Sequence, residues 1–180
     1  MEKLTGSAII TTEMGWVGIS VSGRGLRRVT FPHPNRGRAR EELGEDVLVP
    51  ESEFGDLPER LRAYFSGEPV SFPDQLDFSG ASPFQRCVWE SARLISYGRT
   101  VSYGALAWEM GHPGVARAVG RALGQNPLPI VVPCHRVTRV GGRVGGYRGG
   151  MGLKETLLRL EARGTASNGR RPARFVATER

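Results

Sequence analysis

The residues best suited to chemistry stand together in the stretch VVPCHRVTRVGGRVGGYR at residues 131–148. An apolar run that is typical of a buried strand ends at a proline, and Cys134, His135 and Arg136 follow it directly. The thiolate is the reactive form of cysteine; a neighbouring histidine can lower its pKa or take its proton, and an arginine adds positive potential. The glycines that follow allow the backbone to approach a ligand closely. This pattern predicts a reactive thiol at Cys134.

A cysteine beside a histidine also fits a cysteine hydrolase or a redox thiol. No second cysteine lies nearby to resolve a disulfide, which counts against redox cycling, and hydrolase dyads generally draw their members from distant segments. Cys87 is interpreted as a small apolar filler. No metal site is predicted, because His33, His112, His135 and the two cysteines never occur at zinc-ligand spacing. The remaining interpretation is a nucleophilic thiol that attacks a molecule bound next to it.

Composition indicates the compartment and the kind of partner. The 180 residues are 39% hydrophobic and 24% charged, as in soluble globular proteins, and neither a membrane-spanning stretch nor a signal peptide is apparent, which predicts a cytoplasmic protein. The net charge is +7, and this indicates an anionic partner, with nucleic acid the first candidate. An arginine-rich genome would produce the same charge, so composition alone leaves both explanations open.

The first third of the chain is predicted to be rich in β-structure. Residues 16–21 alternate between apolar and polar, and after the turn SGRG residues 26–31 form the return strand of a hairpin. Residues 32–53 are charged and interrupted by prolines, which predicts a loop or a weak element. Apolar residues at helical spacing then predict a short helix over 57–65 that stops at Ser66-Gly67.

Helices are predicted beyond a proline-rich passage around residues 69–83, which places the domains at 1–80 and 81–164, followed by a basic, disordered tail at 165–180. One helix runs from Phe84 to Ile95, and a last one from Leu153 ends at Gly164. Between them, Ser102 caps a helix that extends to Met110, and the turn GHPG leads into the segment GVARAVGRALGQN. Two short helices joined by a glycine-containing turn match the helix-turn-helix outline.

The segment VARAVGRALG has an unusual composition for a helix. A glycine inside a helix costs about 1 kcal/mol relative to alanine, and a helix accepts this where its backbone must approach something closely. One interpretation is tight packing against another helix. The other is a helix face that is pressed into a DNA groove, with Arg117 or Arg121 reaching in.

Several motifs in this order resemble one family. PCHRV is followed by GGYRGG and K-x-x-LL-x-x-E and preceded by VSYGALA, ARAVG and NP, as in the O6-alkylguanine-DNA alkyltransferases, also called methylated-DNA–protein-cysteine methyltransferases. The resemblance is dense from Phe84 to Glu161 and looser over the TEMGW…GLRRVTF hairpin, which is similar to the small β-domain of the family. It implies an α/β fold: a small N-terminal β-sheet (ribonuclease H-like) unit with a helix, followed by a mainly helical alkyltransferase domain with a helix-turn-helix.

The resemblance also implies an activity without a cofactor: direct DNA repair, in which each molecule acts once and O4-alkylthymine is a second candidate substrate. Cys134 would attack the alkyl carbon on guanine O6. His135 would take the thiol proton through a water, and Glu161 would orient this histidine. Tyr103 would donate a proton to the departing guanine, and Asn126 would tie the recognition helix to the active-site turn. Without the resemblance, Glu161 fits a solvated helix residue and Tyr103 a residue that packs on the core.

Chemistry at O6 requires a base that is flipped out of the stack. By resemblance, Arg117 would fill the vacated space from the minor groove, and the flipped guanine would rest on a pocket of backbone and side chains. The expected DNA contacts are Arg117, Ala116, Ala118, Gly120, Arg121 and Ser102, and the expected pocket residues are Val137, Tyr147, Arg148 and Gly149. Arg148 stands where several family members carry a small residue, so its side chain decides whether the pocket is narrowed.

Two other functions compete with this one. Alkyltransferase-like proteins flip damaged bases without removing the alkyl group, but they lack the reactive cysteine that this chain has as Cys134. A helix-turn-helix regulator that signals through a methylated cysteine would carry a further regulatory domain. The expected partner is therefore double-stranded DNA that contains O6-alkylguanine, bound by a monomer, with no membrane and no metal involved.

Overall fold

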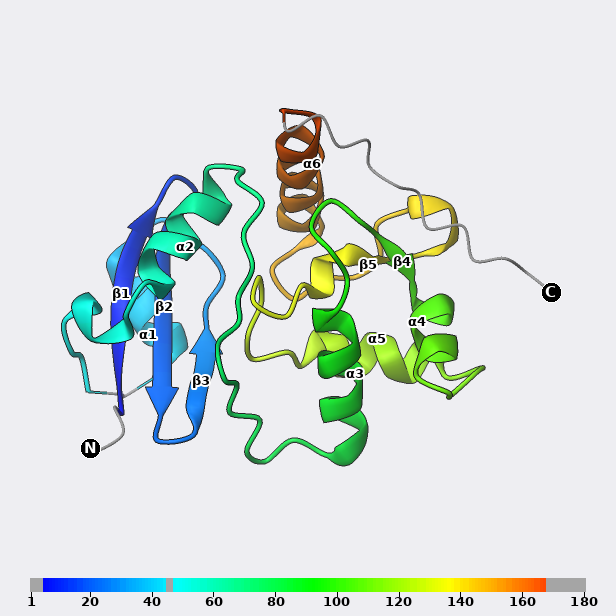
Figure 1. Cartoon of the computed structure of the whole chain (residues 1–180), viewed down its shortest axis with the longest axis horizontal. Helices are drawn as coiled ribbons and strands as arrows, with labels where there is room; N and C mark the ends of the chain where they lie inside the picture. Colours follow the sequence, from blue (N-terminus) through cyan, green and yellow to red (C-terminus); the bar gives the residue numbers. More distant parts are fainter. Residues whose placement is uncertain (1–4, 45–46, 168–180) are drawn as a thin grey trace. The chain divides into compact units, whose positions relative to one another are not determined.

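The computed structural model describes residues 5–44 and 47–167 (Figure 1). Contacts within the chain define two compact units. The first comprises the described residues up to Ser79 together with Pro127–Val131, and the second comprises Gly80–Asn126 and the described residues from Val132 onwards. Residues 165–167, predicted as the start of a disordered tail, are helical, and the rest of that predicted tail, 168–180, lies outside the described residues.

The first unit is built on an antiparallel sheet in the order β1-β2-β3 (Figure 1). Its strands are β1 (Gly6–Thr12), β2 (Gly15–Ser22) and β3 (Gly25–Val29), so the predicted hairpin is present and β1 is an addition to it. Gly15 has a φ of 119°, and a Cβ there would lie 2.4 Å from the carbonyl oxygen of His33, so the turn into β2 requires glycine.

Two helices belong to this sheet. The predicted helix is α2 (Leu57–Phe65), which buries Leu61, Tyr64 and Phe65. Residues 32–53, predicted as a loop or weak element, contain α1 (Arg36–Leu43) and the start of the 3₁₀ turn η1 (Glu51–Phe54). The sequence of α1 has little apolar periodicity, and only Ala39 and Leu43 of this helix are buried. Packing against β2 therefore stabilises the helix.

The second unit is mainly helical. Helix α3 (Pro83–Arg93) begins with a capping box between Ser82 and Gln85, and α4 (Tyr103–Glu109) begins at Ser102, whose hydroxyl accepts from the Ala105 N–H as expected of an N-cap. Helix α5 (Ala116–Gly124) packs on both α3 and α4. A short parallel pair, β4 (Val101–Ser102) with β5 (Val137–Thr138), and a last helix, α6 (Met151–Ser167), complete the unit. A small antiparallel sheet followed by helices confirms the predicted fold class.

Two local predictions are wrong. The apolar run before Pro133 is not a strand but a turn at residues 130–131, in which Ile130 has a φ of 75°. The prolines at 127, 129 and 133 lack the N–H groups that a strand ladder needs. Helix α6 does not end at Gly164 but continues to Ser167, since Gly164 and Thr165 are buried. Within the described ranges, no helix has the length and apolar character to cross a bilayer.

Candidate active site

Cys134 begins the 3₁₀ turn η2 (Cys134–Arg136) and is 5% exposed. Its Sγ accepts a hydrogen bond from Asn126 Nδ2 at 3.1 Å and lies 3.9 Å from the Tyr147 hydroxyl. The same amide donates to the carbonyl of Val132 at 2.9 Å, so Asn126, which follows α5, holds the turn that carries the cysteine. Burial raises the pKa of Cys134 and outweighs the hydrogen bond from Asn126. The thiol is therefore protonated at rest and needs a base.

His135 and Glu161 form a fully buried pair between η2 and α6. His135 Nε2 lies 2.7 Å from Glu161 Oε1, and the two side chains are 0% and 1% exposed. Burial lowers the pKa of His135 although Glu161 acts to raise it, so the imidazole is neutral near pH 7. With its hydrogen on Nε2 and donated to Glu161, the neutral ring carries its basic lone pair on Nδ1.

Arg136 is directed to Glu161 rather than to the thiol. Its Nε and Nη2 donate to the two carboxylate oxygens at 3.0–3.1 Å, and its Nη1 donates to the carbonyl of Ile95 at 2.5 Å. Burial alone would raise the pKa of Glu161, but His135 and Arg136 outweigh it and hold this pKa at about 2. The expectation that Arg136 adds positive potential at Cys134 is thus corrected: the cations that lower the pKa of the thiol are Lys154 and Arg148.

Gly98 adds a backbone donor to the same carboxylate. Its N–H lies 2.9 Å from Glu161 Oε2. The φ of Gly98 is 72°, and a Cβ there would lie 2.3 Å from Cγ2 of Thr165. Only glycine fits this position, and no local pattern in the sequence indicates that Gly98 contributes to the site.

Lys154 is the other site residue to which the sequence assigned no role. It is 0% exposed, and its Nζ donates to the carbonyl of Val137 at 2.6 Å and to the Tyr103 hydroxyl at 3.3 Å. Burial lowers the pKa of this amine. A usable signal existed: Lys154 and Glu161 are seven residues apart, which places both on one face of α6.

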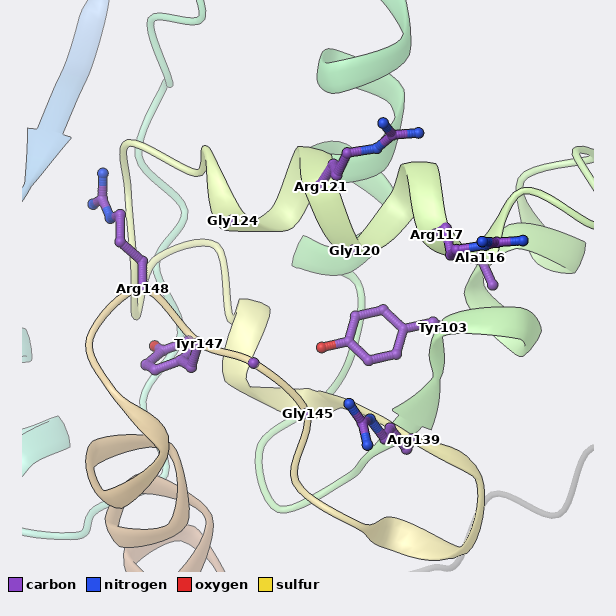
Figure 2. A pocket seen from close by; sticks show the side chains of 11 residues that line it. Tyr103, Ala116, Arg117, Gly120, Arg121, Gly124, Arg139, Gly145, Tyr147 and Arg148 are labelled. Atoms are coloured by element: carbon purple, nitrogen blue, oxygen red, sulfur yellow. The ribbon is translucent and has the colours of Figure 1, made fainter.

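A pocket of about 590 Å³ opens beside Tyr147 (Figure 2). Helix α5 and the loop before α6 supply most of its lining, and the Tyr103 side chain lies between these two segments (Figure 2). The lining residues are Tyr103, Ala116, Arg117, Gly120, Arg121, Gly124, Arg139, Gly145, Gly146, Tyr147 and Arg148. In this lining, drawn from the described part of the chain, four residues are arginines and none is acidic, so the pocket suits an anionic ligand.

Helix α5 presents its arginines on one side. Arg117 and Arg121 are exposed and one turn apart, whereas Val119 is buried. A Cβ on Gly120 would lie 3.6 Å from the ring of Tyr103, so a small residue lets α5 approach this ring closely. Arg148 also lines the pocket, and its side chain points away from Tyr103 (Figure 2).

The remaining expected residues lie outside the pocket lining. They are Ser102, which caps α4; Ala118, which is half-buried on α5; Val137, whose carbonyl accepts from Lys154; and Gly149. Cys87 is half-buried on α3 rather than a core filler. Among residues 5–44 and 47–167, no three His, Cys, Asp or Glu side chains gather as metal ligands would.

Known proteins are similar to this chain in sequence. Residues 83–163 match the family described as 6-O-methylguanine DNA methyltransferase, DNA binding domain. A methylated-DNA–protein-cysteine methyltransferase of Methanosarcina acetivorans is 38% identical over 154 residues, which cover 86% of this chain and 96% of the relative. One from Mycolicibacterium paratuberculosis is 53% identical over 110 residues, which cover 61% of this chain and 66%, just under two thirds, of that relative.

Solved structures share the fold as well. A crystal structure of Mycobacterium tuberculosis OGT in complex with DNA has a TM-score of 0.73 at 37% identity and covers 86% of this chain and 91% of that one. The O6-methylguanine-DNA methyltransferase of Pyrococcus kodakaraensis has a TM-score of 0.67 at 29% identity and covers 86% and 98% of the two chains. The similarity therefore extends over most of the chain and includes the site around Cys134.

Proposed function

The chain belongs to the methylated-DNA–protein-cysteine methyltransferase family, and we propose that it repairs O6-alkylguanine in DNA by transferring the alkyl group to its own Cys134. One observation carries this proposal. A buried thiol is held by Asn126 next to a neutral histidine that is paired with a carboxylate, and Tyr147 connects this thiol to an arginine-lined pocket.

The transfer begins with removal of the thiol proton. Because the pKa of Cys134 is raised and that of His135 is lowered, the resting state holds a neutral thiol and a neutral base. The proton passes to His135 Nδ1 through a water, and the imidazolium is stabilised by Glu161. The thiolate then attacks the alkyl carbon, so that the S–C bond forms while the bond between carbon and guanine O6 breaks.

The departing guanine receives a proton from Tyr103. Burial raises the pKa of Tyr103, as does the nearby Cys134, so this hydroxyl stays protonated at neutral pH and can donate. Lys154 Nζ holds the hydroxyl at 3.3 Å and orients it. His135 afterwards releases its proton and Tyr103 regains one, so that the net change moves the thiol hydrogen to guanine and the alkyl group to sulfur. The thioether has no route back, and each molecule acts once.

DNA is recognised through the pocket and α5. A guanine within the stack cannot reach a buried thiol, so the base is flipped into the pocket, and Arg117 enters from the minor groove to fill the space. The exposed position of Arg117 on α5, beside the pocket, supports this. Arg148 lines the pocket, and its side chain points away from Tyr103, so it does not narrow the space beside that ring. The protein acts as a monomer in the cytoplasm and needs no cofactor.

Mass spectrometry after a single exposure to substrate tests the proposal. An equimolar duplex with methyl-labelled O6-methylguanine should leave one label per protein, on the peptide that contains Cys134. Cys134→Ser and Cys134→Ala should take up none while they still bind DNA, and Cys87→Ser is the matched control that keeps full transfer. A label on Cys87, or more than one methyl removed per molecule, would contradict the assignment.

A further inference from the structure

The ion cluster behind Cys134 contains one charged group more than a cysteine–histidine–carboxylate triad requires. The Glu161 carboxylate receives His135 Nε2, three contacts from Arg136 and the N–H of Gly98. Arg136 is itself 6% exposed. A carboxylate has about four lone-pair positions, and here the bidentate guanidinium occupies a large share of them.

A lone buried carboxylate would work against the proposed first step. It favours the charged form of a histidine bonded to it, and an imidazole that is already protonated cannot take the thiol proton. In this cluster the charge of Glu161 is balanced by Arg136 before His135 gains any proton. The other groups that face the cluster are Lys154 on α6, Cys134 on η2 and Tyr97, whose ring lies 5.6 Å from the Arg136 guanidinium.

We propose that Arg136 is a positioning residue that neutralises Glu161 and thereby keeps His135 uncharged, so that His135 is able to accept the Cys134 proton at neutral pH. The catalytic consequence of this inference rests on the proposed function. Arg136 does not touch the reacting atoms, and it acts through the carboxylate that it binds.

The electrostatic balance at His135 supports this role. Burial contributes most to lowering the pKa of His135, Glu161 opposes it, and Arg136 and then Lys154 act in the same direction as burial. Removing Arg136 leaves Glu161 as an uncompensated buried anion, and the simplest compensation is a proton on His135. The geometry also favours arginine over lysine, because one guanidinium bridges both Glu161 oxygens and the Ile95 carbonyl.

The test compares Arg136→Met with Arg136→Lys, which keeps the positive charge but loses the fork. Single-turnover transfer from O6-methylguanine DNA is measured from pH 5.5 to 9.5. We expect the acid limb of the Arg136→Met profile to move up by one pH unit or more, so that the rate falls about 10-fold or more near pH 6.5 and recovers at high pH. Arg136→Lys should keep the wild-type midpoint. A loss that is equal at every pH would overturn the inference and leave Arg136 with a structural role only.

The ¹⁵N NMR signals of labelled histidine provide a reading that needs no substrate. The His135 ring should be neutral at pH 7 in the wild type and protonated in Arg136→Met, and a neutral ring in that variant would also overturn the inference. If the wild-type protein shows no transfer, the proposed function fails while this measurement still decides the role of Arg136.

Arg136→Met carries a buried, unbalanced carboxylate and is the variant most at risk of not folding. In the double variant Arg136→Met/Glu161→Gln the whole ion pair is absent, so His135 should be neutral at pH 7, with its ring titrating no higher than in the wild type. A His135 that is protonated at pH 7 in the double variant would show that the charge balance between Glu161 and Arg136 does not set its state.

Discussion

Replacing Asn126 tests how the turn that carries the thiol is held. Asn126 is 2% exposed, and its Nδ2 donates to Cys134 Sγ at 3.1 Å and to the Val132 carbonyl at 2.9 Å. The Val132 carbonyl also accepts from the Cys134 N–H at 2.8 Å, so Asn126→Ala leaves this carbonyl with one donor. The cost is then the two side-chain hydrogen bonds, at about 1 kcal/mol each, or roughly 2 kcal/mol of unfolding free energy.

The same change acts on the reactivity of the thiol. The bond from Asn126 lowers the pKa of Cys134, so its loss raises that pKa further above the ordinary value. A higher thiol pKa means less thiolate at neutral pH, and each unit corresponds to about a 10-fold loss. We therefore expect transfer by Asn126→Ala to be slowed most at pH 6–7 and the deficit to shrink as the pH rises toward the thiol pKa.

Two assays on one pair of variants separate these effects. Urea unfolding is followed by tryptophan fluorescence, to which Trp89, 4% exposed in the same unit, contributes, and single-turnover transfer is followed from pH 6 to 9.5. Gln125→Ala is the matched control, because this exposed neighbour bonds only at the surface, to Gln85. Its stability should stay within about 0.5 kcal/mol of the wild type. An equally small change in Asn126→Ala, or a transfer deficit that does not depend on pH, would refute the reasoning.

Three further variants address the leaving group and the DNA. Tyr103→Phe should slow single-turnover transfer by about 10- to 1,000-fold because the proton donor is lost, with DNA affinity unchanged in a filter-binding assay; an unchanged rate would rule out the donor role. Lys154→Met should slow transfer about 10-fold or more and lower stability in urea by about 1–3 kcal/mol, since the buried Val137 carbonyl loses a charged donor; wild-type values of both would show that the amine orients nothing. Arg117→Ala should bind undamaged duplex nearly as well as the wild type but repair a paired O6-methylguanine about 10-fold or more slowly, because the flipped state loses a stabilising residue. The deficit should be smallest on single strands, where flipping is already easy. An equal deficit on duplex and single-stranded substrates would identify Arg117 as an ordinary phosphate contact.

The helices that could be predicted have strong local signals. Ser82 with Gln85 and Ser102 mark the starts of α3 and α4, and the apolar spacing over 57–65 marks α2. Strand β1 has no such signal, because its first three residues are all buried and the alternation that reveals a half-buried strand is absent. The run before Pro133 has the apolar composition of a buried strand, but the prolines within it prevent a strand ladder.

The candidate active site likewise contains residues that the sequence indicates and residues that it does not. Cys134 and His135 are neighbours, and their chemistry is visible in the sequence, as is the link to Asn126 once the resemblance is used. The partner of Arg136 lies 25 residues away on α6, and no local pattern indicates that this side chain turns from the thiol to Glu161. The direction of a long side chain is decided by which buried group needs its charge, and this is a property of the folded core.

Burial decides between two roles that the sequence leaves open for His135, which could lower the pKa of the thiol or take its proton. A thiol flanked by a histidine and an arginine is typical of a cysteine that is already ionised at rest, but the structure directs the arginine elsewhere and buries the thiol, so its pKa rises. A preformed thiolate would need no base, and Glu161 would then be an accessory. With a neutral thiol the proton must leave during the reaction, and the protonation state of His135 controls whether it can. The Glu161–Arg136 pair sets that state, and the chemistry at sulfur therefore depends on two side chains that never touch it.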